Sequence, residues 1–448
     1  MPEDRSTARR SERTPAVAYV LKAYPRLSET YIHSEIHRLE KLGLRLRLYA
    51  IKPPEPTENA MRHPVVDRIR AVPVYLPPVT SVSSVSLAAW LRANLRPFLA
   101  PLARVTRRWP RGLVRAGAAA LAQSVRARDR ALAPPRKVYL KELLQAVALS
   151  DHLREAADVR HLHAHYAHGS TTVAWFASLI TRIPFSFTAH AKDVYSDGLN
   201  PAGLLRRKLT AARFAVTCTG AGAEHLRAIA PQSRVHVVYH GLNDDLARLA
   251  DRAPRNGSRN GSLQLLGVGR LVEKKGFDVF VEACAELRRR DIPFAATIAG
   301  PDGPHGPAIR ELIASQRLEE SFRLAGALSQ RELFDEYMRA NALCLPCRVV
   351  GSDRDGMPNV LVEAMACGTP VVTTGISGIP ELVSDGVNGL LVDPDDPAAL
   401  ASAIARLDSD RRSAERLGSA GRATVRERFD GDRLAGRLAE LFQAELER

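Results

Sequence analysis

Residues 351–368 read GSDRDGMPNVLVEAMACG, a polar loop that becomes an apolar helical pattern after Pro358. The first backbone N–H groups of a helix lack partners within the helix, and the helix dipole adds partial positive charge there. Such a helix start suits an anion or a ligand with many hydroxyl groups. Asp355 in the loop and Glu363 in the helix lie eight positions apart. We therefore expect them to bind two parts of one extended ligand, and the separation excludes a tight pair of carboxylates.

This stretch resembles the signature of family 4 glycosyltransferases, retaining enzymes of the GT-B fold, in which two Glu residues separated by seven others span this loop and helix. Asp355 replaces the first Glu, while Gly356, Pro358, Glu363, Ala364 and Gly368 match. The resemblance implies that Glu363 binds the ribose hydroxyls of a nucleotide sugar. It also implies that Asp355, a catalytic candidate one methylene shorter than Glu, holds the sugar ring together with the N–H groups that follow. The implied donor-binding residues of this stretch are Gly356, Met357, Pro358, Asn359, Val360 and Glu363.

A second motif follows the apolar run at residues 263–268, which predicts a buried strand. Gly269 permits a turn, Arg270 and Lys275 supply two positive charges, and a helix is expected to begin near Gly276. This arrangement suits a diphosphate. In family 4 the matching Arg and Lys stabilise the departing nucleotide diphosphate, so the resemblance implies that both are catalytic and that Gly269 belongs to the donor site. The physical requirement is a positioned clamp for the negative charge that develops on the leaving oxygen.

The chain has 448 residues, enough for two hydrophobic cores. Its net charge of +15 is unevenly distributed, because residues 1–262 hold 41 Lys and Arg against 20 Asp and Glu, whereas residues 263–448 hold 23 against 29. A strongly basic half suggests a polyanionic partner such as a membrane surface, nucleic acid or a phosphate-bearing substrate. Five scattered cysteines argue against a disulfide framework and for a reducing compartment.

Alternating strand and helix patterns predict parallel, doubly wound sheets, and the resemblance implies an α/β GT-B architecture of two Rossmann-like domains facing a cleft. Residues 1–14 are expected to be a disordered basic tail, and residues 15–250 an acceptor-binding domain. The polar sequence DRAPRNGSRNGS at 251–262 predicts a linker. Residues 263–424 are expected to form the nucleotide-sugar domain, and residues 425–448 a helix that crosses back to the first domain.

Residues 80–137 interrupt the alternation and predict a helical insertion. Between Arg92 and Lys137 there are twelve basic residues and one acidic residue, Asp129, interleaved with Trp and Leu. One interpretation is an interfacial element that meets anionic lipid, and the other is a helical insertion with a solvated arginine face. We expect short helices, because prolines at 97, 101, 110, 134 and 135 interrupt backbone bonding.

Histidines cluster near two expected strand ends of the first domain. His190 follows the strand 185–189 in FTAHAKDVY, which resembles a family segment whose His faces the donor sugar, so a catalytic role is implied. His161, His163, His165 and His168 have a spacing that invites a metal interpretation, but no carboxylate or thiol is near them in the sequence. The family analogy instead places one of them, with His165 as the candidate, at the acceptor. Ser28, Glu29 and Thr30 are either donor or acceptor contacts or a helix cap.

Three further patterns suggest other chemistry. Asp353-Arg354-Asp355 has the spacing of metal-dependent glycosyltransferases, but those bind metal after a strand of a one-domain fold. Cys344 and Cys347 have redox or zinc spacing without a second pair, and Gly267-Val268-Gly269 lacks the third glycine of a dinucleotide fingerprint. We therefore expect no metal and no other cofactor.

These features predict a retaining hexosyltransferase that uses a UDP- or GDP-sugar. The segments around LSET, AHAKD and RDGMPNVLVEAMA resemble the bacterial exopolysaccharide branch of the family, of the colanic acid type. That resemblance implies a saccharide acceptor carried on a lipid diphosphate, an anionic membrane surface as partner, no nucleic acid, and a cytoplasmic location at the inner face of the plasma membrane. The alternatives are a nucleotide-sugar epimerase or phosphorylase of the same fold, and a basic membrane-surface binder without enzymatic activity.

Overall fold

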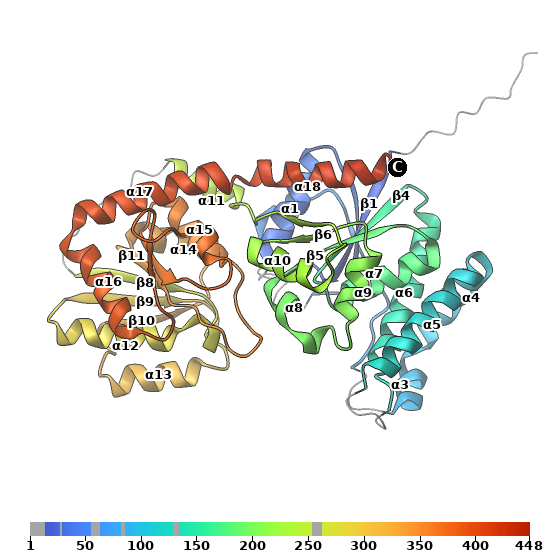
Figure 1. The fold of residues 1–448 in the computed structure, drawn as a ribbon, viewed down its shortest axis with the longest axis horizontal. Coiled ribbons are helices and arrows are strands. Elements are labelled where there is room, and N and C mark those ends of the chain that lie inside the picture. The colour runs from blue at the N-terminus through green and yellow to red at the C-terminus, as the bar shows by residue number, and fades with distance from the viewer. Residues whose placement is uncertain (1–13, 27–28, 55–62, 82–85, 129–133, 253–261) are drawn as a thin grey trace, which may run out of the picture.

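The computed structural model describes residues 14–26, 29–54, 63–81, 86–128, 134–252 and 262–448, which form two α/β domains (Figure 1). The first contains a seven-stranded parallel sheet of order β3-β2-β1-β4-β5-β6-β7. Its strands are β1 Ala16–Ala23, β2 Arg45–Lys52, β3 Pro73–Tyr75, β4 Val159–His165, β5 Phe185–Ala189, β6 Ala215–Thr217 and β7 Val235–Val237.

The second domain contains a six-stranded parallel sheet of order β10-β9-β8-β11-β12-β13. Its strands are β8 Leu263–Val268, β9 Phe294–Ala299, β10 Phe322–Gly326, β11 Ala342–Leu345, β12 Val371–Thr374 and β13 Leu390–Val392. In both sheets the strand order reverses direction beside the first strand, which is the doubly wound pattern. The predicted pair of Rossmann-like domains is therefore confirmed.

Strand β1 shows why its sequence is apolar throughout. Val17, Tyr19 and Leu21 pack on one side against α1 (Thr30–Lys41) and α18 (Gly431–Leu446). The alternate residues Ala16, Ala18 and Val20 belong to the core on the other side, beneath α6 (Val138–Glu155) and α7 (Gly169–Thr181). Because helices cover both faces, a central parallel strand has no solvent-facing side and needs no polar alternation.

The predicted insertion forms three helices outside α6 and α7, namely α3 Leu87–Asn94, α4 Arg96–Arg108 and α5 Pro110–Arg126. Pro97 and Pro110 lie in the first turns of α4 and α5, where a missing N–H costs little. Pro101 removes a backbone bond as expected but does not end its helix, because it lies inside α4. Because Pro101 has no N–H, the carbonyl of Pro97 lacks its donor within the helix. Pro97 is exposed, so water supplies the hydrogen bond.

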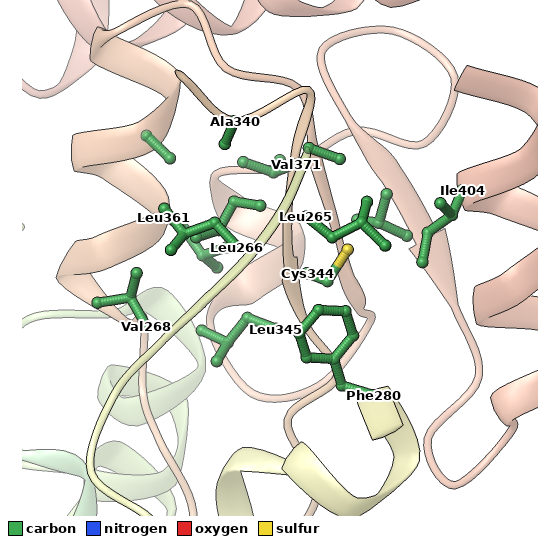
Figure 2. Packing of buried hydrophobic residues seen from close by; sticks show 14 of the residues in the cluster. Leu265, Leu266, Val268, Phe280, Ala340, Cys344, Leu345, Leu361, Val371 and Ile404 are labelled. Atoms are coloured by element: carbon green, nitrogen blue, oxygen red, sulfur yellow. The ribbon is translucent and has the colours of Figure 1, made fainter. Parts of the chain in front are cut away.

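The remaining helices of the first domain are short and follow its later strands. They are α8 Ala191–Tyr195, α9 Leu204–Ala211 and α10 Gly220–Ile229. In the second domain the helices are α12 Phe277–Arg289, α13 Gly306–Ser315, α14 Gln330–Arg339, α15 Asn359–Ala366, α16 Pro397–Ser409 and α17 Arg411–Arg428. Helix α11 Asp244–Arg252 packs on α14 and α15 of the second domain, and its Leu246 and Ala250 belong to that core. Figure 2 shows how the core of this domain gathers side chains from β8, β11, β12 and the helices around them. Gly267 matters there, because a Cβ atom at that position would lie 3.0 Å from the Phe277 ring and 3.3 Å from the Phe280 ring.

The chain returns to the first domain near its C-terminal end. Helix α17 stays with the second domain, and α18 lies on α1 and β4 of the first, so the two follow one another across both domains (Figure 1). The crossing therefore falls at residues 429–430, several residues after the predicted start at residue 425. Most of the predicted linker, like most of the predicted N-terminal tail, lies outside the described residues.

The Phe280→Ala variant should lower the free energy of unfolding by about 3–5 kcal/mol, because it removes a fully buried ring and leaves a cavity. Urea unfolding followed by circular dichroism will measure the loss. Val387→Ala is the control, since that side chain is 59% exposed and its truncation should change stability by less than about 0.5 kcal/mol. Equal effects of the two variants would contradict the assigned core.

Candidate active site

The candidate site lies where the carboxyl ends of the two sheets approach one another. In each sheet the strand order switches direction, between β1 and β4 in the first and between β8 and β11 in the second. Open parallel sheets bind ligands in the crevice outside such a switch point. His165 ends β4, and Gly269 and Arg270 follow β8, so several residues predicted from the sequence lie at these two switch points.

Lys275 and Asp355 connect the two motifs of the second domain. Lys275 Nζ lies 2.7 Å from Asp355 Oδ2, and Lys274 Nζ lies 3.3 Å from the other carboxylate oxygen. Burial alone would raise the pKa of Asp355, but the two ammonium groups outweigh it and hold that pKa below its usual range. Burial likewise opposes the charge on Lys275, but Asp355 raises the net pKa of the lysine. Both groups are therefore charged at neutral pH.

Lys274 was missed by the sequence reasoning, which assigned only Arg270 and Lys275 to the diphosphate. Its ammonium group also bonds Asp353 Oδ1 at 2.9 Å. Arg270 differs from both lysines because its side chain is exposed, and within the described part of the chain we find no acidic partner for it. The three cations thus provide two positions fixed by carboxylates and one that is available to a ligand.

Glycines allow the backbone to pack closely around this cluster. A Cβ atom on Gly269 would lie 3.0 Å from the Lys275 side chain, and one on Gly300 would lie 2.0 Å from the Gly269 carbonyl. Gly276 has a φ of 66° and precedes α12, and a Cβ there would lie 1.9 Å from the Pro346 carbonyl. At Gly276 and Gly300 a side chain would collide with backbone atoms, and Gly269 has a φ of 153°, which other residues rarely adopt.

Glu363 lies in α15 as predicted. Its Oε2 accepts a hydrogen bond from the Tyr337 hydroxyl at 2.8 Å, a partner on α14 that the sequence did not indicate. Burial raises the pKa of Glu363, and the bond from Tyr337 opposes that shift only in part. Glu363 and Asn359 also line a small pocket whose other wall includes Thr30, Tyr31 and His240 of the first domain.

The loop after Asp355 contacts the first domain. A Cβ on Gly356 would lie 3.3 Å from Ala191 Cβ, and one on Gly378 would lie 2.3 Å from Thr219 Cγ2. Glu381 of the second domain accepts bonds from the N–H groups of Gly220 at 2.6 Å and Ala221 at 2.9 Å. It therefore caps the first turn of α10 across the domain boundary. Met357, Asn359 and Val360 are half-buried and Pro358 is buried.

His190 lies at the end of β5 and is buried among polar groups. Its Nε2 is 3.3 Å from His165 Nδ1, and His165 Nε2 is 3.0 Å from Glu35 Oε1 on α1. The Tyr19 hydroxyl donates to the same Glu35 oxygen at 2.8 Å. Burial lowers the pKa of His190 well below its usual range. Burial would raise the pKa of Glu35, but His165 outweighs it and makes the net shift downward.

The Glu35–His165–His190 chain fixes ring positions rather than exposing each ring to a ligand. An ionised Glu35 accepts a hydrogen bond from His165 Nε2, and the other ring nitrogen of His165 lies within hydrogen-bonding distance of His190 Nε2. Because His165 is only 1% exposed, it lies behind His190. Its predicted contact with the acceptor stays a prediction, and Glu35 is a residue that the sequence reasoning missed.

The predicted LSET segment is partly described. Ser28 lies outside the described residues, and Thr30 begins α1. Glu29 accepts from the Tyr166 hydroxyl at 2.7 Å and forms an ion pair with Arg26 at 2.5 Å. Glu29 precedes α1, but its side chain makes no capping hydrogen bond to that helix. Its observed partners place it in the polar network at the end of β4, which argues against the helix-cap interpretation for this residue.

The sequence argued against a metal site at the histidines because no carboxylate or thiol lies near them along the chain. That argument was wrong, because the fold brings such groups beside them. Glu35 lies with His163 and His165, and Cys218 lies with His190 and His240. However, both His163 ring nitrogens already bond hydroxyl groups, at 2.8 Å to Ser186 and 3.0 Å to Thr188. Burial also raises the pKa of the Cys218 thiol to about 12, which opposes the thiolate that a metal prefers. All five cysteines of the chain are free.

Comparisons with known proteins agree with this geometry. Residues 251–424 match the model described as glycosyl transferases group 1, and residues 102–246 match glycosyltransferase family 4. The D-inositol 3-phosphate glycosyltransferase of Thermobispora bispora is 32% identical over 337 residues, which cover 69% of this chain and 76% of the relative. This chain belongs to the group 1, family 4 glycosyltransferases.

A second relative of this glycosyltransferase is the putative colanic acid biosynthesis glycosyltransferase WcaL of Salmonella typhimurium, 35% identical over 218 residues. That match covers 48% of this chain and 52% of WcaL, so the chain spans about half the length of such a relative. The structure of Anabaena HepE in complex with UDP and glucose superposes with a TM-score of 0.65 at 16% identity, covering 96% of this chain and 100% of HepE. At this identity the likeness shows the GT-B fold. Among the described residues, no helix of the glycosyltransferase is long and apolar enough to cross a membrane.

Stability should fall as the pH is lowered from about 6.5 toward 4.5. Burial lowers the pKa of His161 and His33 to about 3 and that of His240 to about 4. Between these values and about 6.5 the unfolded chain binds protons that the folded chain does not, so each histidine removes up to about 1.4 kcal/mol per pH unit. Urea midpoints at pH 7.5, 6.5 and 5.5 measure this effect. A constant midpoint would show that these rings become protonated in the fold.

Glu35→Gln should disturb the histidine chain while preserving side-chain shape. The variant replaces a charged acceptor by a neutral amide oxygen and so weakens the bond that holds the hydrogen on His165 Nε2, and nitrogen NMR shifts should report a changed protonation pattern of the His165 ring. Transfer activity should fall about tenfold to a hundredfold, as for other partners that orient a functional histidine. Glu155→Gln is the control, since that carboxylate is exposed and pairs with the neighbouring Arg154. An unchanged protonation pattern would refute the positioning role.

Proposed function

We propose that this protein transfers a hexose from a UDP- or GDP-sugar to a saccharide acceptor with retention of configuration. The observation that carries the proposal is the pairing of Lys275 with Asp355 beside the unpaired Arg270, at the switch point of the second sheet. In this assignment Arg270 and Lys275 bind the diphosphate, Asp355 and Gly356 hold the sugar, and Glu363 binds the ribose. An epimerase would need no acceptor, whereas the polar network around His190 provides groups opposite the donor loop.

The proposed chemistry requires no protein nucleophile. The acceptor oxygen bonds the anomeric carbon on the face from which the diphosphate leaves, the bond from that carbon to the diphosphate oxygen breaks, and the acceptor proton passes to the departing diphosphate. Asp355 is poorly suited as a nucleophile, because two ammonium groups bond its oxygens and stabilise its charge. Arg270 and Lys275 favour the transition state by stabilising charge on the leaving oxygen. His190, kept neutral by burial, is suited to a hydrogen bond with a sugar hydroxyl.

We also propose that no metal takes part, because Arg270 and Lys275 are placed to bind the diphosphate oxygens that a divalent ion binds in other transferases. The similarity to WcaL supports a role in exopolysaccharide synthesis. A saccharide on a lipid diphosphate is the acceptor that suits such a pathway, and it places the protein at the inner face of the plasma membrane. No nucleic-acid partner enters this proposal.

Thermal unfolding with UDP, GDP, ADP and their sugar conjugates tests the donor site. A ligand at about 100 times its dissociation constant should stabilise the fold by about 2.7 kcal/mol. The stabilisation should disappear in Lys275→Ala and Arg270→Ala, and in a transfer assay either loss should lower the rate about a hundredfold to a thousandfold. Arg289→Ala is the matched control, because Arg289 ends the helix that follows Lys275 and forms an ion pair with Glu286, away from the Lys275–Asp355 cluster. No shift with any nucleotide would refute the donor site.

A further inference from the structure

Helix α5 presents an apolar stripe to solvent. Val114 is 72% exposed, Leu121 is 64% exposed and Val125 is 39% exposed. At about 100° per residue these three side chains project within about 20° of the same direction. Its other side packs on α6 and α7. The helix is therefore apolar on both sides, which is unusual for a surface helix whose outer face meets only water.

Arginines accompany the stripe. The segment from α3 to α5, residues 87–126, contains eight arginines and no Asp or Glu. Within the described part of the chain, the ion pair that we find for these arginines is that of Arg104 with Asp151. Arg111 and Arg115 project about 60° to 100° from Val114, along one flank of the stripe. The combination is an apolar ridge with a cationic border.

A shallow hollow lies at the first turn of α5, beside these arginines. Its walls are Pro110, Arg111, Val114 and Arg115 of α5 and Arg182 after α7. Packing fixes the hollow, because Gly112 approaches α7 so closely that a Cβ there would lie 2.1 Å from the Ile180 carbonyl. The Arg115 guanidinium also donates to the Leu179 carbonyl at 3.1 Å. Three guanidinium groups around an apolar floor suit a phosphate group that carries hydrocarbon chains. The guanidinium groups bind the phosphate, and the hydrocarbon chains contact the apolar side chains of α5.

The position of the surface is compatible with simultaneous catalysis. Helices α3, α4 and α5 lie on the side of the first domain that faces away from the second domain (Figure 1). They therefore leave the cleft uncovered.

We propose that the outer face of α5, formed by Val114, Leu121 and Val125 with Arg111, Arg115 and Arg182, docks on an anionic lipid bilayer. The apolar side chains enter the boundary between headgroups and acyl chains, and the guanidinium groups bind lipid phosphates. Nucleic acid fits less well, because an exposed aliphatic stripe gains nothing from a wet, hydrophilic polyanion. The inference deepens the proposed function by naming the partner surface, but it does not depend on catalysis.

Vesicle sedimentation tests the docking face. The full chain should bind phosphatidylcholine vesicles containing 30% phosphatidylglycerol and bind pure phosphatidylcholine at least tenfold more weakly. Both Val114→Asp with Leu121→Asp, and Arg111→Glu with Arg115→Glu, should weaken binding to the anionic vesicles at least tenfold. The controls are Val387→Asp, whose parent side chain is 59% exposed, and Arg412→Glu on α17 of the second domain. Equal losses in the controls, or no binding by the parent chain, would overturn the proposal.

Two further measurements separate this proposal from other outcomes. All five native cysteines are buried, so Leu121→Cys accepts an environment-sensitive dye at one site, and its emission should shift to the blue on anionic vesicles while Val387→Cys should not. Transfer RNA that displaces the protein from vesicles through the same residues, without a blue shift, would assign the face to nucleic acid and overturn the proposal. Nucleotide-induced stabilisation of the same variants reports separately on the donor site, so failure of docking and failure of the proposed function are distinguishable.

Discussion

The ion pair between Lys275 and Asp355 is the interaction on which the candidate site depends. It joins the turn before α12 to the loop before α15, and those loops follow β8 and β11, which are neighbours at the switch point of the second sheet. Lys275 keeps Asp355 ionised, and Asp355 keeps Lys275 in place beside the exposed Arg270. A negatively charged diphosphate therefore meets a cation whose position is already fixed, which lowers the cost of organising the site when charge develops.

The same pair explains the distribution of glycine around the cluster. Lys275 reaches Asp355 only because Gly269 leaves room for its side chain and Gly276 lies against the Pro346 carbonyl. At the boundary with the first domain, Gly356 and Gly378 let the second domain approach the first, where Glu381 caps α10. Close backbone contacts thus position the charged groups in the second domain and also bring His190 opposite the donor loop.

The sequence predicted the fold well because its signals are local. The predicted strands at 263–268 and 185–189 match β8 and β5 residue for residue. The first is mostly apolar because helices cover both faces of a central parallel strand. The two motifs of the second domain were likewise predicted, because each consists of residues that are close together in the sequence. Tyr337, Glu35 and Glu381 were missed or left without a partner because their partners, Glu363, His165 and the start of α10, lie 26 to 161 positions away. No spacing rule connects residues that only tertiary packing brings together.

Charge distribution separates the two tasks of the molecule. The second half of the chain has six more acidic than basic residues, yet it supplies the local cations at 270, 274 and 275 that suit a diphosphate. Donor binding therefore does not account for the surplus of 21 positive charges in residues 1–262. Eight of those charges lie in residues 87–126, outside the cleft and without an acidic residue among them. Carboxylates at such exposed positions would lessen repulsion between the arginines, so their absence argues for an external anionic partner rather than for stability of the fold.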